Sequence, residues 1–228
     1  FGRGIVNTPS NFGQLGERPT HPELLDYLAS TFMENGWSLK KLHREIMLSS
    51  TYALSASDDP VNSSKDGPNT LFWRANRNRL DAESLRDSML AVSGRLDLSS
   101  GDLAAKLDDK NRKRTIYGFI SRRRLDPMLS LFDFPNPNST CESRVTTNVP
   151  LQRLYFMNSS FVGQQAKALA DRFTGSTETR IRAMYRALFS RAPEAPEVNA
   201  GVEYISRGSD WTSYARALLT SNEFVFTE

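Results

Sequence analysis

Residues 160 to 189, SFVGQQAKALADRFTGSTETRIRAMYRALF, contain two successive groups of apolar side chains at helical spacing. The first group is Phe161, Leu169 and Phe173, and the second is Ile181, Met184, Tyr185 and Leu188. Apolar residues three, four or seven positions apart lie on one face of an α-helix. We therefore predict consecutive amphipathic helices, each of which buries one face in a core.

The same pattern extends in both directions along the chain. It continues through Val202 and Ile205 and then Trp211, Tyr214 and Leu218. Towards the N-terminus, a side chain that can cap a helix precedes an apolar run at Ser38, at Asp81 and at Thr20, where Glu23 would complete a capping box. The best strand candidates are residues 115 to 120, TIYGFI, and residues 145 to 149. The predicted fold is mainly α: a multi-helix, bundle-like domain with at most a small two-stranded β element and long irregular loops.

Residues 55 to 70, SASDDPVNSSKDGPNT, contain almost no apolar side chain and are typical of a long surface loop. A length of 228 residues suits one large domain or two small ones. We predict a single domain of a larger protein. Its subdomains would be residues 1–54, an arm plus a helix hairpin, and residues 71–228, a helical core.

The composition excludes several classes of protein. No apolar run approaches the ~20 residues of a membrane-spanning helix. Two histidines and one cysteine exclude a histidine-rich zinc site and an iron–sulfur cluster, and no CxxCH motif is present to attach haem. We therefore predict no metal and no cofactor in this chain. Its 22 arginines greatly outnumber its 7 lysines, and most should pair with the 26 acidic residues.

Residues 131 to 144, LFDFPNPNSTCESR, interrupt the helical pattern with prolines and hydrogen-bonding side chains. They follow a run from Lys110 to Arg124 that contains seven basic residues and no acidic one. A proline-stiffened loop beside arginines would suit ligand binding. The predicted binding residues are Arg122, Arg123, Arg124, Asp133, Asn136, Asn138, Arg144, Gln152 and Asn158. The competing interpretation is that these polar groups cap helices and satisfy the backbone of an irregular connection.

Catalytic candidates are few. We single out His43, Asp133 and Cys141 as groups able to exchange a proton or attack a substrate. Arg144 would favour the thiolate of Cys141 if the two side chains meet. No motif of a hydrolase surrounds any of these residues, so the sequence favours a chain that is not an enzyme on its own.

Seven segments together resemble a planctomycete-type C-terminal domain of unknown function, the PSD family, found in exported proteins associated with cytochrome c. The segments are FGRGIV (1–6), HPELLDYLA (21–29), GWSLKKLHREIMLSSTY (36–52), NRLDAESLRDSMLAVSGRLD (78–97), YGFISRRR (117–124), LFDFPNPN (131–138) and PLQRLYFMN (150–158). The resemblance implies an exported or periplasmic bacterial protein, with haem c elsewhere in the full-length chain. It implies no activity.

Three hypotheses for function follow. The leading one is an accessory or interaction domain that binds other domains of the same polypeptide, such as a cytochrome domain, through the arginine-rich surface. The second is a carbohydrate-directed enzyme module with a polar site near residues 122–158. The third is binding of an anionic ligand, a polysaccharide or nucleic acid. Asp108, Asp109 and Asp126 flank the basic run and count against nucleic acid.

Overall fold

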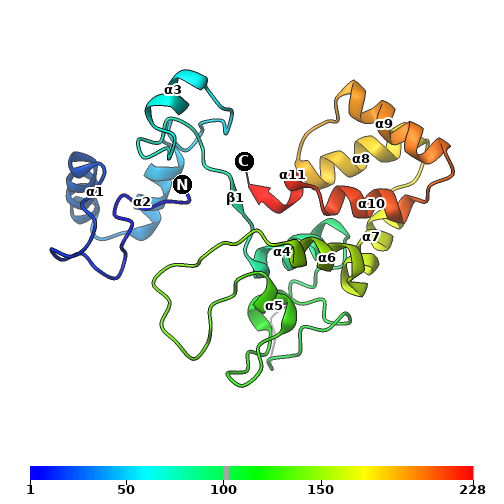
Figure 1. The fold of residues 1–228 in the computed structure, drawn as a ribbon, viewed down its shortest axis with the longest axis horizontal. Helices are drawn as coiled ribbons and strands as arrows, with labels where there is room; N and C mark the ends of the chain where they lie inside the picture. The colour runs from blue at the N-terminus through cyan, green and yellow to red at the C-terminus, as the bar shows by residue number, and fades with distance from the viewer. Residues whose placement is uncertain (100–102, 228) are drawn as a thin grey trace. The chain divides into compact units, whose positions relative to one another are not determined.

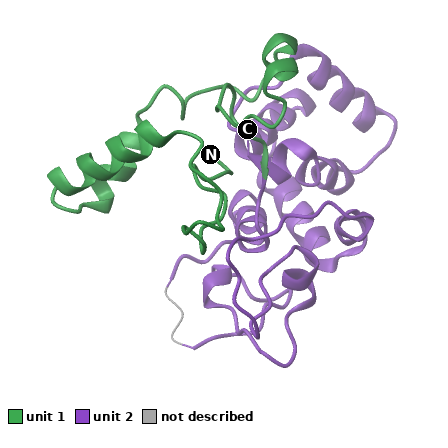
Figure 2. Cartoon of the chain, turned by 60° about the vertical axis from the view of Figure 1, so that its left-hand side comes forward, with its two compact units in different colours: residues 1–78, 228 green, residues 79–227 purple. Residues whose placement is uncertain are grey.

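A computed structural model describes residues 1–99 and 103–227 and divides them into two compact units (Figures 1 and 2). Unit 1 comprises residues 1–78 and unit 2 residues 79–227. The fold is mainly α with a small two-stranded sheet, which confirms the predicted fold class. The helices of unit 1 are α1 (Pro22–Glu34), α2 (Leu39–Met47) and α3 (Pro60–Lys65). Those of unit 2 are α4 (Ala82–Val92), α5 (Pro127–Leu131), α6 (Pro150–Asn158), α7 (Ser160–Arg172), α8 (Thr177–Phe189), α9 (Ala195–Ser206), α10 (Trp211–Leu219) and α11 (Asn222–Val225), with a 3₁₀ turn at Thr115–Tyr117.

In unit 1, α1 and α2 form the predicted helix hairpin, but the predicted capping box of α1 is wrong. The N-cap is His21, which makes no capping hydrogen bond with its side chain. The helix thus begins one residue later than predicted, and the hydroxyl of Thr20 donates to the carbonyl of Ile5 in the N-terminal arm at 3.3 Å. Ser38 does cap α2, accepting from the Lys41 N–H at 3.4 Å. The expected loop at 55–70 lies within unit 1 and contains α3.

The core of unit 2 is built on the stretch 160–189, which forms α7 and α8 as predicted. Leu169 on α7 and Ile181 on α8 are completely buried, and each contributes about 1.5–3 kcal/mol through burial. Helix α10 packs along α7 and also meets α8 and α9 (Figure 1). Gly201 permits the approach of α9, because a Cβ there would lie 2.6 Å from the Tyr214 hydroxyl and 2.8 Å from Ile181 Cδ1.

The strand predictions were wrong in position. Residues 115–117 form the 3₁₀ turn, and residues 145–149 form no strand. The sheet instead pairs β1 (Asn78–Arg79) with β2 (Phe226–Thr227). Thr115 accounts for the turn: both its N–H and its hydroxyl donate to Asp87 Oδ1, at 2.8 and 2.6 Å, so a side chain of α4 holds this residue. Gly118, further along the predicted strand, forms an isolated β-bridge with Ala105. β-Propensity reflects packing more than an intrinsic backbone preference.

Candidate functional site

Asp133, one of the predicted site residues, lies in a left-handed backbone conformation (φ 63°) just after α5. Its carboxylate accepts from Arg79 Nη2 at 2.7 Å and from the N–H and hydroxyl of Thr147, both at 2.8 Å. Arg79 also donates to the Thr147 carbonyl at 2.6 Å. Burial would raise the pKa of Asp133, but the hydrogen bonds from Thr147 and Arg79 outweigh it and hold this pKa below its ordinary value. Asp133 therefore ties the loop to β1.

Arg144 fixes the far end of the same loop to α4. Its two terminal nitrogens donate to both carboxylate oxygens of Glu83, at 2.8 and 2.7 Å. Its guanidinium also lies 5.4 Å from the centre of the Phe134 ring, and Asp81 is 3.4 Å away. The Glu83 contact is the main reason why the pKa of Arg144 is raised above its ordinary value. Arg144 is therefore engaged by acidic side chains of its own unit.

The amides of the loop bond mainly to backbone atoms. Asn136 Oδ1 accepts from the Asn138 N–H at 3.0 Å, and Asn138 Nδ2 donates to the Arg122 carbonyl at 2.8 Å. Gln152 is buried, and its Nε2 donates to the Leu131 carbonyl at 3.0 Å. These bonds match the competing interpretation, in which polar groups satisfy an irregular connection.

The remaining predicted residues are exposed. The side chains of Arg122, Arg123 and Arg124 form no ion pair with any residue that the structure describes. Asn158 lies at the end of α6, and Cys141 donates its thiol hydrogen to the Ser143 carbonyl at 3.1 Å. His43 lies on α2 in unit 1.

The structure brings together some of the predicted residues. Asp133 and Gln152 both bond to Thr147, since Gln152 Nε2 donates to the Thr147 hydroxyl at 3.5 Å. Asn138 contacts Arg122 only at the backbone carbonyl of Arg122, so this contact does not involve the Arg122 guanidinium. Arg144 bonds to α4 separately. None of the three cavities described below is lined by Asp133, by Arg144 or by the arginine triplet.

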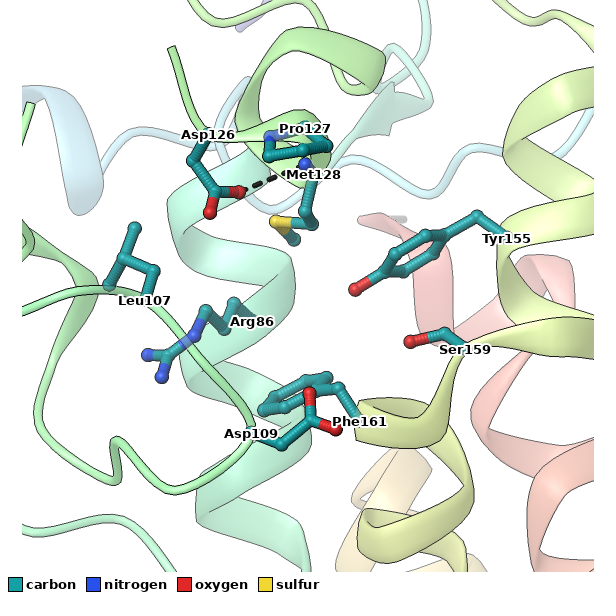
Figure 3. Close-up of a pocket in the computed structure, with 9 residues that line it drawn as sticks. All are labelled: Arg86, Leu107, Asp109, Asp126, Pro127, Met128, Tyr155, Ser159 and Phe161. Atoms are coloured by element: carbon teal, nitrogen blue, oxygen red, sulfur yellow. Dashed lines mark hydrogen bonds between the residues drawn. The ribbon is translucent and has the colours of Figure 1, made fainter. Parts of the chain in front are cut away.

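A cavity that the sequence did not predict lies elsewhere in unit 2 and has a volume of about 170 Å³ (Figure 3). We call it the Tyr155 pocket. It lies between α4, the start of α5, the end of α6 and the start of α7. Its lining residues are Arg86, Leu107, Asp109, Asp126, Pro127, Met128, Tyr155, Ser159 and Phe161. Figure 3 shows the hydroxyl groups of Tyr155 and Ser159 directed towards the open space.

Each carboxylate of the Tyr155 pocket is held by one oxygen and leaves the other free. Asp126 Oδ1 caps α5, accepting from the N–H groups of Met128 and Leu129 at 2.9 and 3.3 Å. Asp109 Oδ2 accepts from the Ser160 hydroxyl and from Gln164. Neither Asp126 Oδ2 nor Asp109 Oδ1 has a hydrogen bond to a described residue. Two oriented acceptors are thus available to a ligand.

The positive charge in the wall of the Tyr155 pocket is already engaged. Arg86 is buried and donates to the carbonyls of Asn111 and Lys113, at 2.5 and 3.0 Å. Burial raises the pKa of Tyr155, and the charges of Asp126 and Asp109 raise it further. The phenol therefore stays protonated at neutral pH, able to donate a hydrogen bond. Within residues 1–99 and 103–227, no three acidic, histidine or cysteine side chains gather as a metal site would require.

Little in the sequence indicates the Tyr155 pocket. Asp126 caps α5, and this local function hides a second one. Asp109 was interpreted as one of the acids flanking the basic run. Only the packing of α6 against the loop before the 3₁₀ turn brings Tyr155 near them.

Unit 1 differs from unit 2 because its helix hairpin has almost no buried core. No residue of α1 or α2 is buried, and among described residues 1–78 only Ala56 and Asn69 are. A largely apolar cavity of about 360 Å³ lies between the N-terminal arm and the hairpin and is lined by residues such as Phe1, Ile5, Leu24, Leu28, Ile46 and Phe72. We call the exposed apolar residues of the hairpin the hairpin surface; they are Leu24, Leu25, Tyr27, Met33, Trp37, Leu39 and Met47.

Comparison with protein families shows which family the chain belongs to. Residues 1–205 match the model of PSD1, described as a protein of unknown function (DUF1553). The chain belongs to the PSD1 family. The PSD1 match includes both units but ends before α10 and α11, which complete the core of unit 2. No match was found among curated proteins or among solved structures.

Proposed function

We propose that this PSD1 chain is a protein-interaction domain that binds its partner through the hairpin surface. The observation that carries this proposal is the absence of any buried side chain from α1 and α2. Amphipathic helices gain most of their stability by packing an apolar face against another element. A hairpin that leaves many of its apolar residues exposed and none fully buried is therefore suited to completing its core with another protein.

The exposure of individual side chains supports the proposal. On the hairpin surface Trp37 is 67% exposed, Leu39 62% and Met47 57%. Large exposed apolar areas mark protein–protein interaction sites.

The charges of the hairpin define the chemistry of the partner. Helix α1 carries Glu23, Asp26 and Glu34 and no basic residue. Helix α2 carries three basic residues, Lys40, Lys41 and Arg44, and a single acidic one. The partner we propose is a folded protein surface that is apolar at its centre, basic where it meets α1 and acidic where it meets α2. Such complementarity orients partners and speeds their association.

We further propose that the partner is a neighbouring domain of the same exported polypeptide, with a c-type cytochrome domain as the first candidate. This rests on the sequence resemblance together with the hairpin surface. None of the helices within the described ranges is long and apolar enough to span a bilayer.

Site-specific photo-crosslinking in the full-length protein tests the proposal. A benzophenone amino acid replaces Trp37, which is 67% exposed on the hairpin surface, or Arg182, which is exposed on α8 as a control. We expect irradiation to link position 37 to one defined protein segment, identified by mass spectrometry, with a yield well above that at position 182. Equal yields at both positions, or scattered products, would overturn the proposal.

A carbohydrate-directed module remains a second candidate, favoured by the Tyr155 pocket. The free oxygens of Asp126 and Asp109 can accept from sugar hydroxyls, and the ring of Tyr155 offers an apolar face to the sugar. Titration with neutral oligosaccharides tests it. We expect saturable heat of binding in wild type that Asp109→Asn weakens about tenfold, as loss of a charge-assisted hydrogen bond predicts. Absence of saturable binding would exclude it.

A further inference from the structure

A second, smaller cavity of unit 2 concentrates positive charge. Its volume is about 40 Å³, and it lies where β1, the start of α6 and α11 meet. We call it the Arg79 cavity. Its lining residues are Arg79, Phe132, Asn148, Gln152, Arg153, Phe156, Thr220, Asn222, Val225 and Phe226. A water molecule needs only about 10–15 Å³ of such space, so the cavity can hold a group of several heavy atoms.

Arg79 is the buried cation of this cavity. Its side chain is only 4% exposed, and its terminal nitrogens donate to Asp133, Thr147 and the Phe132 carbonyl. Its Nε–H, in contrast, is buried and has no hydrogen-bond partner among the described residues. Leaving a buried donor unpaired is unfavourable, and more so when the group is charged. An acceptor bound in the adjoining cavity would lower this cost.

Further positive potential comes from α6. Arg153 lies in the first turn of this nine-residue helix, is exposed and forms no ion pair with a described residue. The N-terminus of a helix carries about half a positive charge and favours anions. Asp133 balances Arg79, which leaves Arg153 and the helix terminus without a counter-charge. No acidic side chain lines the cavity.

Free hydrogen-bond donors complete the site. The side-chain amides of Asn148 and Asn222 have no hydrogen bond to any residue in the described ranges. We propose that the Arg79 cavity binds a small oxyanion, either a carboxylate group or an inorganic anion such as phosphate. Arg153 and the α6 terminus supply the charge, and Arg79 and the two asparagines supply donors. This site is separate from the hairpin surface and does not depend on the function proposed for it.

NMR titration of the ¹⁵N-labelled 228-residue chain tests the proposal. Acetate, phosphate and chloride are added separately at constant ionic strength, because exposed charges are screened by salt. We expect saturable shifts of the Gln152 and Arg153 amides and of the Arg79 Nε–H signal with acetate or phosphate. The oxyanion that saturates at lower concentration identifies the ligand as a carboxylate or a phosphate.

Two variants make the result decisive. Arg79 is part of the fold, so the test variant is Arg153→Gln, with Arg182→Gln on α8 as a matched exposed control. We expect Arg153→Gln to weaken binding about tenfold, as loss of a charged contact predicts, and Arg182→Gln to leave it unchanged. Shifts that do not saturate, that chloride reproduces, or that are equal in both variants would show that the cavity holds only water and would overturn the proposal.

Discussion

Replacing Asp133 by Asn should destabilise unit 2 by about 2–4 kcal/mol at neutral pH. Asp133 accepts three hydrogen bonds and is the partner of a guanidinium that is 4% exposed. Removing one member of a buried ion pair costs about 3–5 kcal/mol. Asn has the same shape, retains one acceptor and tolerates the left-handed conformation at φ 63°. The expected loss of stability is therefore somewhat smaller than that for complete removal of one member of the pair.

Native-state hydrogen exchange of the buried α7 amides is the appropriate assay, because it reports the unfolding free energy of unit 2 separately from that of unit 1. The matched control is Glu203→Gln, on α9 of the same unit. Glu203 is 61% exposed and accepts from Arg207 at 2.5 Å, so its replacement should cost less than about 0.5 kcal/mol. A cost below about 1 kcal/mol for Asp133→Asn would refute the assignment of Asp133 as a structural anchor and reopen it as a ligand-binding group.

The pH dependence of the same measurement has a defined sign. The pKa of Asp133 is lowered in the folded state, so its contribution is fully present above the unfolded value of about 3.9. That contribution is lost as the pH falls through the lower, folded pKa. The stability difference between wild type and Asp133→Asn should therefore shrink below about pH 4. A difference that stays constant down to pH 2 would contradict the ionised role of this carboxylate.

Two further predictions concern the helical core of unit 2. In urea titrations, Leu169→Ala should lower the unfolding free energy of unit 2 by about 2–5 kcal/mol. Leu151 is 62% exposed, so Leu151→Ala should lower it by less than about 0.5 kcal/mol. Arg191→Lys should lower the melting temperature measurably. Arg191 donates to both carboxylate oxygens of Glu197 and to both of Glu223, at 2.6 to 2.8 Å. The ammonium of a lysine cannot form two such planar, bidentate pairs. An unchanged melting temperature would contradict a role for this network.

The helices were predictable because their signal is local. The apolar spacing within 160–189 depends on neighbours a few positions away, and those positions do form α7 and α8. The caps at Ser38 and Asp81 are equally local, and both are confirmed. The cap predicted at Thr20 is wrong because the helix begins one residue later, with His21 at the N-cap and Pro22 as the first helical residue. The local signal thus located this helix but misplaced its start by one position.

The candidate sites required contacts between distant positions. Asp133 and Gln152 were predicted as site residues from composition, but Arg79, 54 positions from Asp133, had no signal that pointed to it. Likewise, Asp109, Asp126 and Tyr155 were individually unremarkable polar residues until packing placed them around one cavity. Helical periodicity specifies which face of a segment is apolar, because it needs only the spacing of side chains along one backbone. Which polar groups meet, and whether they bond to each other or leave an oxygen free, depends on how the helices pack, and only the tertiary structure shows that.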